Sequence, residues 1–172
     1  FAEQINSSGR VYIFGGGHVA QALEPVLTNI GFRCVVMDDR PDFTRRELFP
    51  TAEEIKLIDF NDIAASVSIT GEDYVCVMTR GHAFDTVVQA QVLPLRPYYV
   101  GVIGSRAKIA AVNARLREAG ISEEKLRTVH TPVGTPIKAV TPAEIAVSIT
   151  GEMIYERACR REDPAHHACP MV

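Results

Sequence analysis

The chain has 172 residues, of which 47% are hydrophobic and 23% charged, and its formal net charge is −3 at pH 7. This length and composition are typical of one globular domain with a substantial core, so we expect residues 1–172 to form a single domain. The slightly acidic balance argues against nucleic-acid binding, which needs a basic surface. No apolar run approaches the roughly 20 residues of a membrane span, and no signal peptide is recognisable.

The first predicted strand, 11–14, leads into a glycine turn and then into a predicted helix that continues to Ile30. Gly15, Gly17 and Ala20 occupy the three small positions of the G-x-G-x-x-G/A dinucleotide fingerprint. In that fingerprint the first glycine permits a tight turn and the second lets a pyrophosphate approach the backbone. The third small residue lets the helix pack against the sheet. The alternative is that these residues only form a tight connection between strand and helix.

A helix that begins after Gly17 would direct free N–H groups and its positive dipole end at a bound anion. The segment that we expect to contact such an anion comprises Gly15, Gly16, Gly17, His18 and Val19. For His18, contact with a phosphate and simple solvation remain equally open.

The second predicted strand, 33–38, ends at Asp38, 21 positions after Gly17. An acidic residue at this place usually holds a ribose hydroxyl, and it would favour NAD over NADP. The polar connection 39–50 that follows has no clear periodicity. We expect it to be either an active-site flap or a loosely ordered loop.

The rest of the chain alternates predicted strands and helices. Strands are predicted over 55–59, 74–78 and 98–103, helices over 83–93, 109–119 and from Thr141 onward, and short elements near 62–67 and 127–130. Such alternation predicts a Rossmann-like α/β fold, with a doubly wound parallel sheet of order 3-2-1-4-5 and helices on both faces. The core is expected to span about 10–157, with a polar tail over 158–172.

In this topology ligands bind beyond the carboxyl ends of the central strands. Arg80, Gly81 and His82 follow the fourth predicted strand, with Asp85 close behind. Arg80 could bind an anion, and His82 could donate or carry a proton. The alternative is an ordinary polar loop.

Gly104, Ser105 and Arg106 follow the fifth predicted strand, and Lys108 lies in the first turn of the next helix. Ser105 is expected to cap that helix. Basic residues at a helix N-terminus oppose its dipole, a conflict that a bound anion would resolve. Solvated surface charge is the alternative.

Two of the four cysteines, Cys34 and Cys76, lie inside apolar runs and are expected to fill the core. This usage is typical of a reducing compartment and predicts a cytoplasmic protein. The tail carries a possible metal cluster of Cys159, His166, His167 and Cys169. No metal site is expected there, because the nine-residue gap between the two cysteines matches no common zinc spacing.

The sequence contains no Tyr-x-x-x-Lys pair, G-x-S-x-G elbow, H-E-x-x-H helix or P-loop. A crevice that can hold an anion but has no assembled catalytic set favours a binding protein over an enzyme. Two other functions stay open. One is an NAD(P)-dependent oxidoreductase with His82 or Asp85 assisting proton transfer, and the other is a nucleotide-sensing regulatory domain.

Taken together, the motifs resemble the C-terminal Rossmann domain of the XdhC/CoxI family, the xanthine dehydrogenase accessory proteins. The resemblance spans about 10–157 and is most specific at GVIGSR (101–106) and TPAEIAVSI (141–149). The other matching segments are GGGHVA (15–20), DDRP (38–41), FP (49–50), TRGH (79–82), and Pro132 with Gly134.

The resemblance implies a maturation factor for a molybdenum hydroxylase. Such a factor binds molybdenum cofactor while a cysteine desulfurase supplies its terminal sulfur, and then helps to deliver it to the apoenzyme. The phosphate of molybdopterin, or the pyrophosphate of its dinucleotide forms, could lie on Gly15–Ala20 with Arg80 or Arg106 as counter-charge.

The family usually carries a further N-terminal domain with a cysteine-containing, glycine-rich motif, which has no match here. Because the chain begins at Phe1 rather than at a methionine, we expect it to be a fragment of a longer protein or one of two separate chains. A homodimer is the default expectation for its assembly.

Overall fold

The strands of this chain are apolar on both sides, and helices cover both sides. In β1 (Arg10–Phe14), Val11 and Ile13 point to one face of the sheet, whereas Tyr12 and Phe14 point to the other. All four side chains are buried. Strands of a parallel sheet that lies between helices are expected to be apolar throughout in this way.

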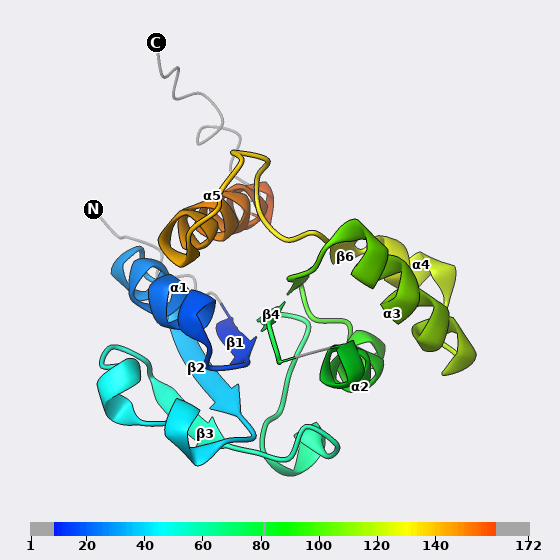
Figure 1. Ribbon diagram of the computed structural model, residues 1–172, viewed down its shortest axis with the longest axis horizontal. Helices are drawn as coiled ribbons and strands as arrows, with labels where there is room; N and C mark the ends of the chain where they lie inside the picture. The colour runs from blue at the N-terminus through cyan, green and yellow to red at the C-terminus, as the bar shows by residue number, and fades with distance from the viewer. Residues whose placement is uncertain (1–8, 81, 161–172) are drawn as a thin grey trace.

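The computed structural model describes residues 9–80 and 82–160 (Figure 1). In this part of the chain the strands form one parallel sheet in the order β3-β2-β1-β4-β5-β6. The other strands are β2 (Arg33–Asp38), β3 (Glu54–Leu57), β4 (Tyr74–Val77), β5 (Tyr99–Val102) and β6 (Val129–His130). The helices are α1 (His18–Asn29), α2 (His82–Val92), α3 (Arg106–Glu118), α4 (Glu123–Arg127) and α5 (Pro142–Arg160).

Helices α1 and α5 pack side by side on one face of the sheet, and α2 and α3 pack on the opposite face (Figure 1). Ala20 on α1 is fully buried, which agrees with its expected role in close packing of helix and sheet. The predicted doubly wound α/β fold is therefore confirmed. None of the described helices is long and apolar enough to cross a membrane.

The sheet has one strand more than the predicted order. The predicted short element near 127–130 is the end of α4 followed by β6, whose Val129 and His130 pair with Val100 and Gly101 of β5. The observed order is thus the predicted 3-2-1-4-5 with β6 added outside β5.

The polar connection after β2 is ordered rather than loose. It contains two 3₁₀ turns, Pro41–Phe43 and Arg46–Leu48, and it ends on the fully buried Phe49. The Arg46 Nη1 group donates a hydrogen bond to the carbonyl of Ala52 at 2.6 Å. These local hydrogen bonds and the burial of Phe49 order the connection, although its sequence has no periodic apolar pattern.

The last helix begins with the predicted capping box. The Glu144 N–H donates to Thr141 Oγ1 at 3.2 Å, and the Glu144 carboxylate accepts from the Thr141 N–H at 2.9 Å. Helix α5 continues to Arg160 and so includes the first three residues of the segment that was predicted as a polar tail. Near the end of α5, Arg157 Nη1 donates a hydrogen bond to the carbonyl of Ile30 at 3.0 Å and so joins this helix to the end of α1.

The tight turn after β1 provides a test of the fold. Gly15 has a φ of +109°, and a Cβ added there would lie 2.4 Å from the carbonyl oxygen of Met78. We expect Gly15→Ala to lower the free energy of unfolding by about 2–4 kcal/mol, from strain and displacement of β4. Urea unfolding measures this change.

Gly17→Ala is the matched control. A Cβ on Gly17 meets nothing within 4 Å, so this variant should lose no more than about 1 kcal/mol. Equal losses for the two variants would contradict the assignment of Gly15 as the strained position.

Candidate functional site

Three of the predicted ligand-binding loops meet at the carboxyl edge of the sheet. Gly15 packs against the backbone of Met78 and Thr79 after β4. Next along the sheet, the Ile103 N–H after β5 donates to the carbonyl of Val77 at 3.0 Å. The glycine turn, the residues directly after β4 and those directly after β5 are therefore neighbours, as the topology predicted.

The N-terminus of α1 is open. Gly17 is its N-cap residue, no side chain caps the helix, and its first turn contains no acidic residue. His18 is exposed and Val19 half-buried. Unpaired N–H groups of a first helical turn bind anions well, and the empty space beside the Gly17 Cα lets an anion come close.

Gly16 has a different environment from Gly17. Its N–H donates to Asp38 Oδ2 at 2.8 Å, and a Cβ added to it would lie 2.3 Å from the carbonyl oxygen of Phe43. Gly16 is therefore covered by the connection after β2. This structural requirement for glycine was not foreseen from the sequence, and a contact of Gly16 with a cofactor stays a prediction.

Asp38 lies at the end of β2 as predicted, and its side chain is 1% exposed. Oδ1 accepts hydrogen bonds from the Arg40 N–H at 3.0 Å and from Arg40 Nε at 2.8 Å. Oδ2 accepts from Arg40 Nη2 at 3.0 Å in addition to the bond from Gly16. Burial alone would raise the pKa of Asp38, but the bonds from Arg40 and from the Gly16 N–H hold that pKa below its usual value.

Arg80 and Arg40 flank the neighbouring carboxylate, Asp39. Arg80 Nη2 donates to Asp39 Oδ2 at 3.1 Å, and Arg40 Nε lies 3.8 Å from Asp39 Oδ1. The Arg80 side chain is 55% exposed, and its guanidinium carbon lies 5.8 Å from the centre of the Phe84 ring. A guanidinium that is held by a carboxylate but is more than half exposed is accessible to an anion.

Gly81 lies outside the described residues, as do the side chains of His82 and Arg106. The structure therefore places His82 and Arg106 only through their backbones, at the first positions of α2 and α3. Their predicted roles in proton transfer and anion binding remain predictions.

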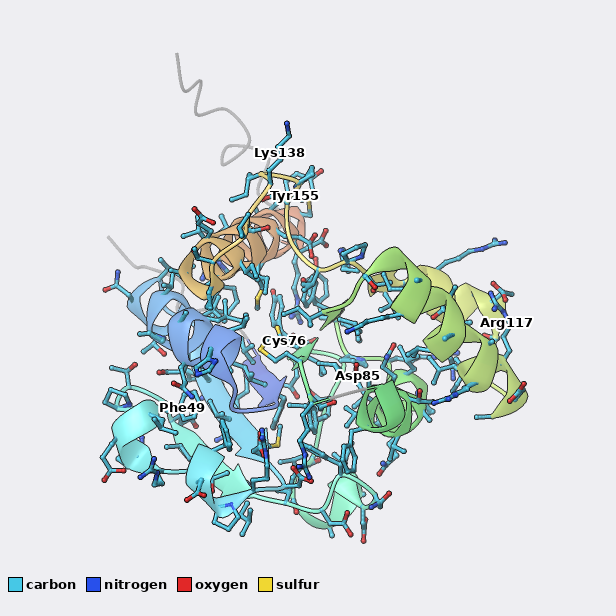
Figure 2. The ribbon with its side chains drawn as sticks, viewed as in Figure 1. Phe49, Cys76, Asp85, Arg117, Lys138 and Tyr155 are labelled. Carbon is cyan, nitrogen blue, oxygen red and sulfur yellow. The ribbon has the colours of Figure 1, made fainter. Side chains whose placement is uncertain are left out.

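Asp85 is buried under the loop that follows β4. Thr79 Oγ1 donates to Asp85 Oδ1 at 2.6 Å, and the Gln89 side-chain amide donates to the Asp85 carbonyl at 3.0 Å. Asp85 lies in the first turn of α2, and Figure 2 labels it between this helix and the strands of the sheet. The carboxylate thus ties this helix to the end of β4, and a role as proton carrier remains a prediction.

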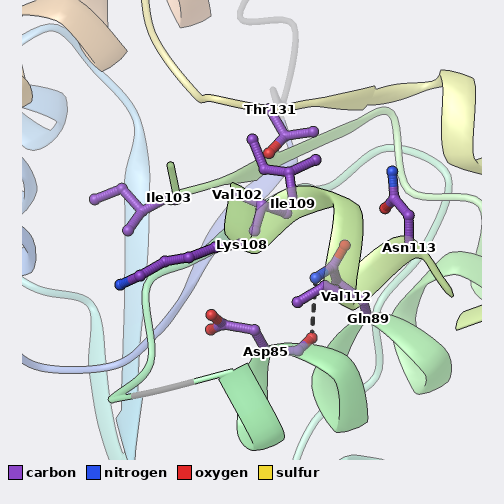
Figure 3. A pocket seen from close by; sticks show the side chains of 10 residues that line it. Asp85, Gln89, Val102, Ile103, Lys108, Ile109, Val112, Asn113 and Thr131 are labelled. Atoms are coloured by element: carbon purple, nitrogen blue, oxygen red, sulfur yellow. Dashed lines mark hydrogen bonds between the residues drawn. The ribbon is translucent and has the colours of Figure 1, made fainter. Parts of the chain in front are cut away.

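A small pocket lies between α2, α3 and the end of β5 (Figure 3). Asp85 and Gln89 line it from α2, and Lys108 lines it from α3. Gly104 lies at its rim, and Ser105 is the exposed N-cap residue of α3 but forms no capping hydrogen bond through its side chain. The free space is about the size of one water molecule, too small for a cofactor.

Several residues at this edge were not singled out as ligand-binding candidates. Arg40 and Asp39 belong to the DDRP motif. The available signal for the ion pair was the arginine two positions after Asp38, which ends an apolar strand. The sequence carried no signal for the Phe43 carbonyl over Gly16. Thr131 Oγ1 lines the small pocket and is buried without a hydrogen-bond partner among the described residues.

The cysteine prediction holds where it can be tested. Cys34 and Cys76 are buried free thiols, and burial raises the pKa of Cys34 to about 12. Both therefore remain protonated and unreactive at neutral pH. No cluster of potential metal ligands occurs among the described residues, whereas His166, His167 and Cys169 of the tail lie outside them.

Comparison with known proteins matches most of the chain to the family that its motifs resemble. The family model of the XdhC Rossmann domain matches residues 11–153. The uncharacterized protein YqeB of Escherichia coli is 29% identical over 149 residues, and a probable xanthine dehydrogenase subunit of Bacillus subtilis is 26% identical over 157 residues. The matches cover 84% and 91% of this chain but only 27% and 46% of those relatives.

A crystal structure of a xanthine dehydrogenase from Bacillus halodurans has a similar fold, with a TM-score of 0.79 and 30% sequence identity. The similarity covers 91% of this chain and 45% of that one. The chain thus spans less than half the length of each of these three relatives.

The buried Asp38 carboxylate makes the free energy of unfolding depend on pH. Its pKa is lowered in the folded state, so its contribution is complete above the unfolded value of about 3.9 and is lost as the pH falls through the folded value. We expect Asp38→Asn to lower the free energy of unfolding by roughly 2–4 kcal/mol at pH 7, with the difference shrinking below about pH 4.

Urea titrations between pH 3 and pH 8 measure this difference. Asp42→Asn, an exposed neighbour in the same connection, should change the stability by no more than about 0.5 kcal/mol. A cost for Asp38→Asn that stays constant down to pH 3 would show that the carboxylate charge is not what holds the edge together.

Proposed function

Because the chain belongs to the XdhC Rossmann-domain family, we propose that it binds molybdenum cofactor as an accessory domain for a molybdenum hydroxylase of the xanthine dehydrogenase type. The observation that carries this proposal is the open N-terminus of α1, which presents N–H donors beside Gly17 that no side chain among the described residues caps. These donors suit a terminal phosphate, the group that molybdopterin offers.

The residues at this edge fit the phosphate end of the cofactor. The space beside Gly17 is the part of the glycine turn that a phosphate can enter, since Gly15 and Gly16 pack against backbone. Arg80 lies on the adjacent loop as the counter-charge, and Arg106 is proposed for the same role. The cofactor would supply the molybdenum centre of the hydroxylase, and this chain would bind and orient it through its phosphate.

The proposed partners follow from this role. A cysteine desulfurase would supply the sulfur ligand of the bound cofactor, and the apoenzyme of the hydroxylase would receive it. Both would approach a cofactor held by one end, which leaves its metal end accessible. The proposal requires no turnover by this chain, in keeping with the lack of a recognisable catalytic set in the sequence.

Removal of the phosphate contacts tests the proposal. We expect Gly17→Val, which fills the space beside the α1 N-terminus, to weaken molybdopterin binding at least about tenfold, which corresponds to roughly 1.4 kcal/mol. Arg80→Ala should weaken it about three- to tenfold, because the arginine is exposed and partly screened. Equilibrium binding of the isolated cofactor, followed by its absorbance after gel filtration, measures both effects.

Arg117→Ala is the control for charge, since Arg117 is also exposed and pairs with a carboxylate, that of Glu123, but lies at the far end of α3 (Figure 2). It should bind the cofactor like the unmodified chain. If both Gly17→Val and Arg80→Ala bound molybdopterin as tightly as the unmodified chain, the cofactor would not bind at this edge of the sheet.

Ligand-dependent thermal unfolding separates this proposal from the oxidoreductase alternative. A ligand at about 100 times its dissociation constant stabilises the fold by roughly 2.7 kcal/mol. Stabilisation by molybdenum cofactor but not by NAD, NADH or NADP is the expected result. Stabilisation by NAD(H) alone would favour the oxidoreductase, with His82 and Asp85 as the first residues to examine.

A further inference from the structure

The carboxylate at the end of β2 is fully occupied by groups of the chain itself. In dinucleotide-binding domains the acid at the end of the second strand accepts hydrogen bonds from a ribose diol. Here Asp38 already accepts four hydrogen bonds, three from Arg40 and one from the Gly16 N–H. A carboxylate has about four acceptor positions, so none remains for a hydroxyl group.

Arg40 is held in this place by a second contact. Its guanidinium carbon lies 3.6 Å from the centre of the Phe43 ring, a stacking geometry that guanidinium groups favour. Phe43 in turn places its carbonyl oxygen against Gly16. To release Asp38, a ligand would have to break a bidentate charge pair, a stacking contact and the cover over the glycine turn.

Asp39 does not replace Asp38 as an acceptor for ribose. Its Oδ2 accepts the hydrogen bond from Arg80 at 3.1 Å. Its Oδ1 lies 3.8 Å from Arg40 Nε and has no hydrogen-bond partner among the described residues, but it is buried and so out of reach of a ribose hydroxyl. The two neighbouring carboxylates are thus both directed at arginines. The acidic groups at this edge position cations for an anionic ligand.

We propose that Arg40 occupies the place of a ribose diol, so that this site accepts ligands through a terminal phosphate and does not recognise the ribose of a nucleotide. This inference rests on the proposed function, because it concerns the same crevice. Applied to the proposed cofactor, it selects molybdopterin with its single phosphate over the dinucleotide forms. Arg40 is then the residue that determines this specificity.

A pair of nucleotides that differ only in the diol tests the inference. AMP and 2′,3′-dideoxy-AMP carry the same phosphate and base, so their affinity ratio reports recognition of the ribose hydroxyls. For the unmodified chain we expect a ratio near one by isothermal titration calorimetry, or no binding of either nucleotide. For Arg40→Ala, which frees Asp38, we expect AMP to bind at least tenfold more tightly than the dideoxy analogue.

Two results would overturn the inference. A tenfold preference for AMP in the unmodified chain would show that the diol is recognised despite Arg40. A ratio near one, or no binding, in Arg40→Ala would show that Asp38 does not face a ribose position. If the alanine variant unfolds, Arg40→Lys replaces it, because a lysine keeps the charge but cannot form the bidentate pair. This variant should prefer AMP over the dideoxy analogue by a ratio between those of the other two chains.

Arg45→Ala is the matched control, since Arg45 is exposed in the same connection and its Nε donates to the Asp42 carbonyl rather than to Asp38. It should leave the ratio unchanged. Molybdopterin binding to the unmodified chain and to Gly17→Val, measured in parallel, keeps the two proposals apart. Loss of the proposed function would appear as no cofactor binding in the unmodified chain, while the AMP ratios would still decide the role of Arg40.

Discussion

The hydrogen bond from the Gly16 N–H to the Asp38 carboxylate is the interaction on which this edge of the sheet depends. It joins the turn after β1 to the end of β2, and Arg40 closes the same carboxylate from the other side. With Gly16 fixed and covered, Gly17 and the first turn of α1 are the part of the glycine turn that stays open. One buried carboxylate thereby separates a filled part of this edge, at Gly16 and Arg40, from an accessible part at Gly17.

Much of the fold could be predicted because its signals are local. The glycine turn, the unbroken apolar run of β4 and the capping box of α5 each determine their element within a few residues, and all three are confirmed. β6 could not be predicted as a strand, because two residues carry no periodicity and it forms only by pairing with β5. The connection 39–50 is ordered by the tertiary burial of Phe49, which propensity does not reveal.

In the candidate site too, local features could be predicted from the sequence and tertiary contacts could not. The sequence placed Asp38 at the end of β2, because strand ends follow from the apolar pattern. It could not reveal that a neighbouring arginine occupies the carboxylate, since the geometry of a side chain depends on the turn at Pro41–Phe43. The glycine turn likewise carries a fingerprint for binding a dinucleotide, yet in this chain only Gly17 and the first turn of α1 are open.

A phosphate bound at the N-terminus of α1, as we propose, should leave the Gly16–Asp38 hydrogen bond intact. The most direct test is an NMR titration of the ¹⁵N-labelled chain with molybdopterin, following the backbone amide signals. We expect large shifts of the His18 and Val19 amide signals and little change in the Gly16 amide signal. Shifts centred on Gly16 and Arg40, with His18 and Val19 unchanged, would contradict it.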